Sequence, residues 1–149
     1  MNWDGKKLLR DELFKFADQC LTFMISIVFM HNGGERIDFI AGALRETGLT
    51  NAEPVWARAE DFGRGAGRGR YDCSVSRAVA ALPTLLELCI PLLKPGGSAL
   101  CWKGPSAPGE CSAAARAARL LGASAPVAHP YELAGHGSFY IVEAVKKLP

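Results

Sequence analysis

The stretch that decides the fold is YDCSVSRAVAALPTLLELCIPLLKPGGSALCWKG, which runs from Tyr71 to Gly104. Its first residues, Tyr71–Ser76, are rich in strand formers, and Ser98–Trp102 has the composition of a second, buried strand. Between them, Pro83 stands where the first turn of a helix tolerates a missing N–H. Two strands joined by one helix form a parallel crossover unit, so the sequence predicts an α/β fold.

The predicted helix of this unit has one apolar face. Pro91 ends or kinks the helix, and the KPGG sequence at 94–97 is typical of a turn before the second strand. The apolar residues recur at helical spacing: Leu82, Leu85, Leu86, Cys89 and Ile90.

Upstream of this unit, the pattern predicts an amphipathic helix over Lys6–Gln19 and a buried strand over Phe23–Met30. A second helix is expected over Glu35–Thr47, stopped by Gly48, and a third strand over Glu53–Ala57. These elements continue the α/β alternation.

Between the third strand and the central unit, the glycine-rich segment Gly63–Arg70 has no large apolar residue, so we expect an unanchored, mobile loop. Downstream, Pro108–Leu121 is an alanine-rich helix closed by Gly122. The last two segments, Pro126–Leu133 and Phe139–Val145, are predicted to be paired strands.

Composition sets the broad class. A chain of 149 residues with 49% hydrophobic and 21% charged residues is expected to form one globular domain. Five widely spaced cysteines without a C-x-x-C pair are typical of reduced core thiols, and three dispersed histidines suggest no metal site. The apolar run Leu21–Met30 is too short to span a bilayer, and no signal-peptide pattern opens the chain. We therefore expect a cytoplasmic protein without a membrane contact.

Several segments together resemble the bacterial 16S ribosomal RNA guanine-N7 methyltransferase family. They are the central stretch, ERIDFI at 35–40, GLTNAEPVWARAEDF at 48–62, GPSA at 104–107 and HPYEL at 129–133. The resemblance implies a Rossmann-like methyltransferase fold, S-adenosylmethionine as cofactor and 16S ribosomal RNA of the small subunit as substrate. Residues 35–149 are family-like on this comparison, and residues 1–34 are atypical. No catalytic base is expected, because N7 of guanine is already nucleophilic.

One family feature is missing from the sequence. The family's first strand ends in a glycine-rich loop that holds the methionine part of the cofactor, but no G-x-G-x-G occurs here. In one register Phe23–Met30 is the family's second strand, and the place of its ribose-binding acid falls at His31 or Asn32. In the other register this segment is the first strand, His31–Gly34 is a degenerate loop, and Glu60 is that acid.

The resemblance also implies site residues. Ala59 and Glu60 match an Ala-Glu pair that borders the adenine of the cofactor. Arg77 follows a strand at the crevice where open α/β sheets bind ligands, and the family uses it at the cofactor and RNA site. Lys103 ends the next strand at the same rim and is a candidate RNA contact. Arg68, flanked by Arg64 and Arg70 between glycines, is a candidate contact to the RNA backbone.

Two further readings remain open from sequence. The chain is either a 16S ribosomal RNA methyltransferase or a decayed homologue that acts at most as an RNA-binding or interaction module. If the first strand is absent, the second and fourth strands expose apolar edges, which predicts a homodimer or a borrowed strand. Tryptophans are expected in the core or on strand faces, but Trp102, beside Lys103, is a candidate for stacking.

Overall fold

The computed structural model of the chain describes residues 26–77, 79–133 and 137–148. The helix predicted at Lys6–Gln19 and the start of the strand predicted at Phe23–Met30 lie outside these residues. The chain divides into two compact units, Met1–Arg58 and Ala59–Pro149, and each is described by itself. The single domain expected from the composition stays a prediction.

The first unit is a parallel β-α-β arrangement. Strand β1 (Ile27–His31) pairs with β2 (Ala52–Trp56), and helix α2 (Gly34–Thr47) connects them, as the sequence predicts. Gly48 ends α2 in a left-handed conformation with φ of 67°, which glycine adopts without steric cost. The small core of this unit contains Leu44 and Leu49, with Ile27, Phe29, Ile40 and Ala52 against them.

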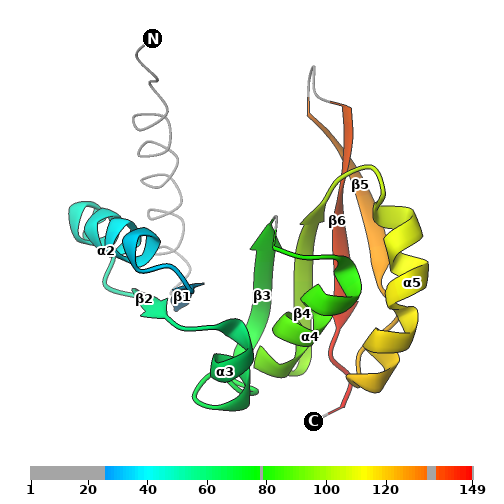
Figure 1. The fold of residues 1–149 in the computed structure, drawn as a ribbon, viewed down its shortest axis with the longest axis horizontal. Helices are drawn as coiled ribbons and strands as arrows, with labels where there is room; N and C mark the ends of the chain where they lie inside the picture. The colour runs from blue at the N-terminus through cyan, green and yellow to red at the C-terminus, as the bar shows by residue number, and fades with distance from the viewer. Residues whose placement is uncertain (1–25, 78, 134–136, 149) are drawn as a thin grey trace. The chain divides into compact units, whose positions relative to one another are not determined.

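The second unit is a four-stranded sheet in the order β3-β4-β6-β5 (Figure 1). Strand β3 runs parallel to β4, whereas β6 pairs antiparallel with both β4 and β5. The elements of this unit, in chain order, are α3 (Ala59–Arg64), β3 (Tyr71–Arg77), α4 (Leu82–Cys89), the 3-10 turn η1 (Ile90–Leu92), β4 (Leu93–Lys103), α5 (Ala107–Leu120), β5 (Val127–Leu133) and β6 (Gly137–Val145). No helix among the described residues is long and apolar enough to cross a membrane.

Helices α4 and α5 pack on one face of this sheet and enclose the main core. The apolar face predicted for α4 is buried, and Pro91 ends the α-helix in η1, which confirms both sequence predictions. On α5 the buried side chains are alanines, which let the helix lie close to the sheet. The fully or almost fully buried positions of the core are Leu82, Leu85, Leu86, Ile90, Leu93, Ala99, Cys101, Ala107, Ala114, Ala118, Val142 and Ala144.

The glycine-rich segment 63–70 is anchored, so the prediction of an unanchored loop is wrong. Its amides are held from a distant part of the chain: Gly69 N–H donates to the Pro91 carbonyl and Arg70 N–H to the Leu92 carbonyl, both at 2.9 Å. Gly67 is buried against the ring of Phe62, where a side chain would collide. The glycines therefore permit close packing, although they carry no apolar side chain.

The KPGG sequence forms a bulge inside β4. Tyr71 pairs with Leu93 but Cys73 pairs with Ser98, so β4 contains three more residues than β3 over this interval. Two backbone hydrogen bonds tie the bulge to the end of β6, from Gly96 N–H to the Lys146 carbonyl and from Lys146 N–H to the Gly97 carbonyl. A Cβ at Gly97 would lie 2.9–3.1 Å from three backbone carbonyl oxygens, so only glycine fits there.

We expect Gly97→Ala to lower the free energy of unfolding by about 2–3 kcal/mol, because the backbone carbonyls around the new Cβ cannot move independently. The measurement is urea denaturation followed by circular dichroism. Gly109→Ala is the matched control, since a Cβ there meets open space in a helix, and it should leave stability unchanged or raise it by up to about 1 kcal/mol. Equal midpoints for the two variants would contradict the steric argument.

Candidate functional site

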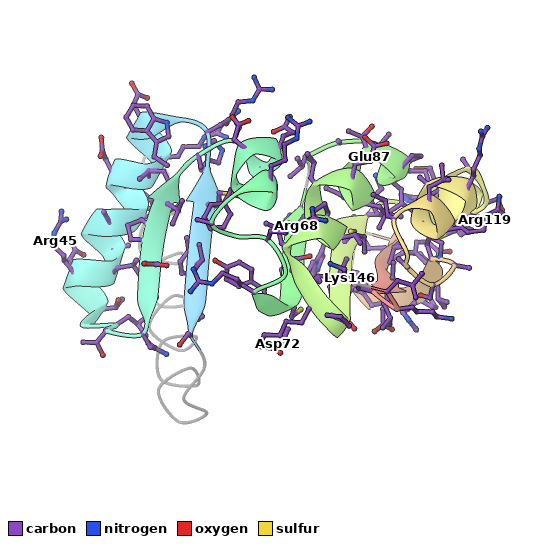
Figure 2. All side chains as sticks on the ribbon, turned by 90° about the horizontal axis from the view of Figure 1, so that it is seen from below. Arg45, Arg68, Asp72, Glu87, Arg119 and Lys146 are labelled. Carbon is purple, nitrogen blue, oxygen red and sulfur yellow. The ribbon has the colours of Figure 1, made fainter. Side chains whose placement is uncertain are left out.

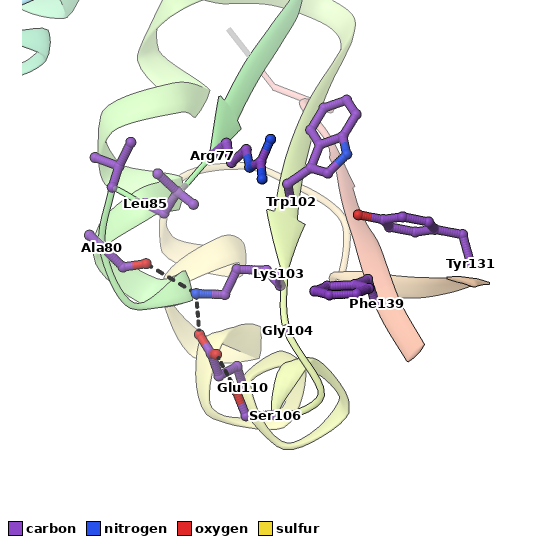
Figure 3. Close-up of a pocket in the computed structure, with 11 residues that line it drawn as sticks. Arg77, Ala80, Leu85, Trp102, Lys103, Gly104, Ser106, Glu110, Tyr131 and Phe139 are labelled. Atoms are coloured by element: carbon purple, nitrogen blue, oxygen red, sulfur yellow. Dashed lines mark hydrogen bonds and ion pairs between the residues drawn. The ribbon is translucent and has the colours of Figure 1, made fainter. Parts of the chain in front are cut away.

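A cavity of about 550 Å³ lies at the carboxyl end of β3 and β4 (Figure 3). Open α/β sheets bind ligands at this end of their parallel strands. The volume is in the range of small-molecule sites, roughly 300–1,000 Å³. The lining residues come from the ends of both strands, from the following loops and helices, and from the β5–β6 hairpin: Arg77, Val79, Ala80, Leu85, Trp102, Lys103, Gly104, Ser106, Glu110, Tyr131 and Phe139.

Arg77 is the last residue of β3, and its exposed side chain lines the cavity. It is the register partner of Trp102 on β4, and its guanidinium points toward the indole in Figure 3. Arg77 takes part in none of the ion pairs between described residues of this unit. Its five N–H donors are therefore available to a ligand at the position where the sequence predicts one.

Lys103, by contrast, is held by the protein itself. Its Nζ lies 2.7 Å from Oε2 of Glu110 and donates to the carbonyl oxygen of Ala80 at 3.1 Å. The side chain is only 12% exposed. Lys103 therefore joins the end of β4 to the loop between β3 and α4 and shapes the rim of the cavity.

Glu110 accepts three hydrogen bonds at this rim. Besides Lys103, the backbone N–H of Leu82 donates to Oε2 at 3.0 Å, and the hydroxyl of Ser106 donates to Oε1 at 3.0 Å. Burial acts to raise the pKa of this carboxyl, but the hydrogen bonds from Lys103, Leu82 and Ser106 outweigh it and hold the pKa below its usual value. Glu110 is thus ionised at neutral pH and fixes the start of α4.

The structure brings two of the predicted site residues, Arg77 and Lys103, into one cavity. Ala59, Glu60 and Arg68 do not line it. Ala59 and Glu60 open helix α3, and both are half-buried. Arg68 is exposed and precedes the amino end of β3, whereas Arg77 closes the carboxyl end, and a strand of this length spans roughly 20 Å. Figure 2 shows Arg68 beside Lys146.

Among the cavity residues that the sequence did not indicate as site residues, Glu110, Tyr131 and Phe139 carry the charged or aromatic side chains. Glu110 gave only a weak signal, four positions after Ser106 at the start of a predicted helix. Tyr131 and Phe139 lie on strands that were predicted, but which face of the hairpin they occupy depends on its pairing with β4. Tyr131 belongs to the HPYEL segment, which resembles the family, so a comparison of sequences could have indicated this residue.

Sheet order and cavity position define a Rossmann-like α/β protein. The fold is similar to that of a SAM-dependent O-methyltransferase from Thermotoga maritima, with a TM-score of 0.58, 12% identity, and 83% of this chain and 51% of that chain covered. It is also similar to M. jannaschii TYW2, solved in complex with AdoMet, with a TM-score of 0.60, 11% identity, and 83% and 58% covered. At this identity the likeness concerns the fold alone.

The sequence comparisons define the family within this class. The model of the GidB family, described as rRNA small subunit methyltransferase G, matches residues 19–130, so the chain belongs to this family. A Desulfitobacterium hafniense protein named ribosomal RNA small subunit methyltransferase G is 37% identical over 129 residues, which are 84% of this chain and 54% of the relative. The chain spans about half the length of the curated relatives that it matches.

Glu110→Gln should reduce stability at neutral pH by about 1–2 kcal/mol, because the amide keeps the shape but loses the ion pair with Lys103. The difference depends on pH with a defined sign. Since the folded-state pKa lies below the ordinary value of 4.5, the wild-type advantage is fully present above that pH and is lost as pH falls through the folded pKa.

The measurement is denaturation of both proteins between neutral and strongly acidic pH. Glu87→Gln is the control, because Glu87 is an exposed carboxylate on the neighbouring helix α4, and this variant should behave like wild type. A stability gap for Glu110→Gln that stays constant through the acidic range would contradict the role of the ionised carboxylate.

Proposed function

We propose that the protein transfers a methyl group from S-adenosylmethionine to N7 of a guanine in 16S ribosomal RNA. One juxtaposition supports the proposal: in a chain of this family, Arg77 lines a cavity at the carboxyl end of the parallel strands and has no ion pair with another described residue. A substrate in the small ribosomal subunit puts the proposed activity in the cytoplasm.

Methyl transfer to guanine N7 requires mainly that the protein positions the two reactants. S-adenosylmethionine, when bound, supplies an activated methyl group, and guanine N7 attacks with a lone pair that needs no deprotonation. The protein must therefore hold the base and balance charge. In this proposal, Arg77 donates to the substrate or to the cofactor carboxylate through paired N–H groups. Lys103 has three N–H donors, of which Glu110 and Ala80 occupy two, so one can serve an RNA oxygen.

The proposal assigns cofactor contacts to residues that follow β2 in the chain. Ala59 and Glu60 follow the end of β2 in the chain and open α3, the place where the family borders the adenine. No G-x-G-x-G that could cradle the methionine end occurs in the sequence. We therefore assign the adenine side to Ala59 and Glu60, and Arg77 stays the described candidate for the carboxylate at the methionine end.

Arg68 would contact the RNA away from the target base. Because it lies at the opposite end of β3 from the cavity, it can reach only a remote part of a large substrate. Arg64 and Arg70 are exposed on the same anchored segment, so the three guanidiniums form a cationic surface for backbone phosphates. A folded ribosomal RNA is large enough to meet both places at once.

A homodimer through a sheet edge also belongs to this proposal. In the strand order 3-2-1-4-5-6 of Rossmann folds, the family's first strand lies between its second and fourth. In the register that makes β1 the second strand, β3 is the fourth, and β3 is an outer strand of its sheet. Its outward residue Val75 is 64% exposed. An outer strand that exposes an apolar side chain favours pairing with another chain.

The test of the proposed activity is methyl transfer from labelled S-adenosylmethionine to small ribosomal subunits that lack N7-methylguanine. Labelled N7-methylguanine in the digested 16S ribosomal RNA supports the proposal. Cofactor binding is followed separately by calorimetry. A chain that binds RNA but neither binds the cofactor nor transfers the methyl group is the decayed homologue, and the proposal is then wrong.

Arg77→Ala should leave the melting temperature almost unchanged, because an exposed arginine at a strand end contributes little to stability. It should weaken RNA or cofactor binding by more than tenfold, since a charge-assisted contact is worth roughly 1.5–3 kcal/mol. Arg77→Lys should recover little of the binding, because lysine cannot donate in pairs. Arg119→Ala, an exposed arginine on α5, is the control. A large drop in melting temperature with unaltered binding would make Arg77 structural.

Val75→Lys should shift the protein from dimer to monomer in analytical ultracentrifugation, because a charge on the apolar β3 edge opposes strand pairing. Val127→Lys is matched to it, since Val127 is also an exposed valine on an outer strand of the same sheet, β5. If Val127→Lys dissociates the dimer instead, or the wild type is a monomer, the β3 edge is not the interface.

A further inference from the structure

Three aromatic side chains gather at one end of the cavity. Tyr131 on β5 and Phe139 on β6 are directly opposite each other in the antiparallel pair. Their ring centroids are 5.8 Å apart and the ring planes differ by 28°, so the rings are stacked. Both side chains are half-buried and line the cavity, so the pair presents aromatic surface to it.

Trp102 extends this aromatic surface on β4. It pairs with Ile141 on β6, two residues beyond Phe139, so alternation puts Trp102 and Phe139 on the same face of the sheet. Arg77, the register partner of Trp102, is on that face as well. Figure 3 shows the indole, the two stacked rings and the guanidinium around the same cavity. We refer to Trp102, Tyr131 and Phe139 as the aromatic wall.

The chemistry of this cavity matches a flat aromatic ligand with polar edges. The aromatic wall offers stacking surface, and the facing groups include a guanidinium with donors to spare. An aliphatic ligand would use neither feature. Nucleobases combine a π-face with edge acceptors, and a base stacks favourably on an aromatic side chain. RNA-binding proteins read unstacked bases in this way.

We propose that the aromatic wall holds an unstacked guanine of the RNA, with Arg77 donating to its O6. This assignment rests on the proposed function, whose substrate atom belongs to guanine, and deepens it by naming the residues that receive the base. Arg77 gives the preference for guanine, because adenine carries an amino donor at the place of O6 and an arginine has no acceptor to meet it.

The first experiment uses Trp102 as its own reporter. The chain has three tryptophans, so the Trp3→Phe, Trp56→Phe protein retains fluorescence from Trp102 alone. Titration with GMP, without cofactor, should quench this fluorescence in a saturable manner. AMP and CMP should bind more weakly, by at least about fivefold, because neither accepts the Arg77 hydrogen bond at O6. Absence of saturable quenching by GMP, or equal affinity for the three nucleotides, overturns the assignment.

The second experiment removes the rings one at a time. Tyr131→Leu, Phe139→Leu and Trp102→Leu should each weaken GMP binding, measured by calorimetry, by at least about fivefold. Trp102→Phe keeps an aromatic ring and should retain most of the affinity. Phe39→Leu, an exposed aromatic on α2, is the control and should bind as wild type. Melting curves identify variants that fail to fold. If a variant does not fold, the titration of the Trp3→Phe, Trp56→Phe protein, in which the aromatic wall is intact, tests the assignment.

The two proposals fail differently. If GMP binds and depends on the aromatic wall while small subunits are not methylated, the wall stands as a guanine site and the proposed activity is wrong. If the protein methylates small subunits but the leucine variants bind GMP and react as the wild type does, the aromatic wall has no part in holding the base.

Discussion

The carboxylate of Glu110 is the interaction on which the functional end of the sheet depends. It accepts from the first backbone N–H of α4, from the hydroxyl before α5 and from the ammonium at the end of β4. The ammonium of Lys103 also donates a hydrogen bond to the carbonyl oxygen of Ala80, which lies between β3 and α4. Without the carboxylate, a largely buried ammonium and a helix N–H would lose their partner, which is costly in a site of low solvent exposure. Glu110 thus holds the start of α4 directly and Ala80 through Lys103.

The register of β4 with its neighbouring strands places Trp102 at the cavity, on the side away from Glu110. The bulge at KPGG inserts three residues into β4 between its pairings with Tyr71 and Cys73. Beyond the bulge, successive side chains of β4 alternate between the two faces of the sheet, so Cys101 is buried under the helices while Trp102 faces the cavity. Gly97, which alone fits among three carbonyl oxygens, makes this bulge sterically feasible.

The two sides of the proposed reaction are separable in this chain. The proposed substrate side lies within one compact unit. Arg77, the rim residues Lys103 and Glu110, and the aromatic wall all line its cavity. On the cofactor side, Ala59 and Glu60 are the candidates for the adenine end, whereas no G-x-G-x-G for the methionine end occurs in the sequence. Base recognition can therefore be measured independently of methyl transfer.

The sequence by itself determined the local elements and the family. Leucines at helical spacing defined α4, Pro91 its end, Gly48 and Gly122 the ends of α2 and α5, and the motifs around Arg77 the family and its best candidate residue. These signals depend on neighbours a few positions apart. Only the tertiary structure decided that segment 63–70 is anchored, that Lys103 is paired with Glu110, and that Trp102 lines one cavity with Tyr131 and Phe139. The carbonyls that hold segment 63–70 lie more than 20 positions along the chain, and Glu110 reaches Leu82 across 28 positions. Such contacts form only after the strands have paired and the helices have packed, because it is packing that brings distant residues together.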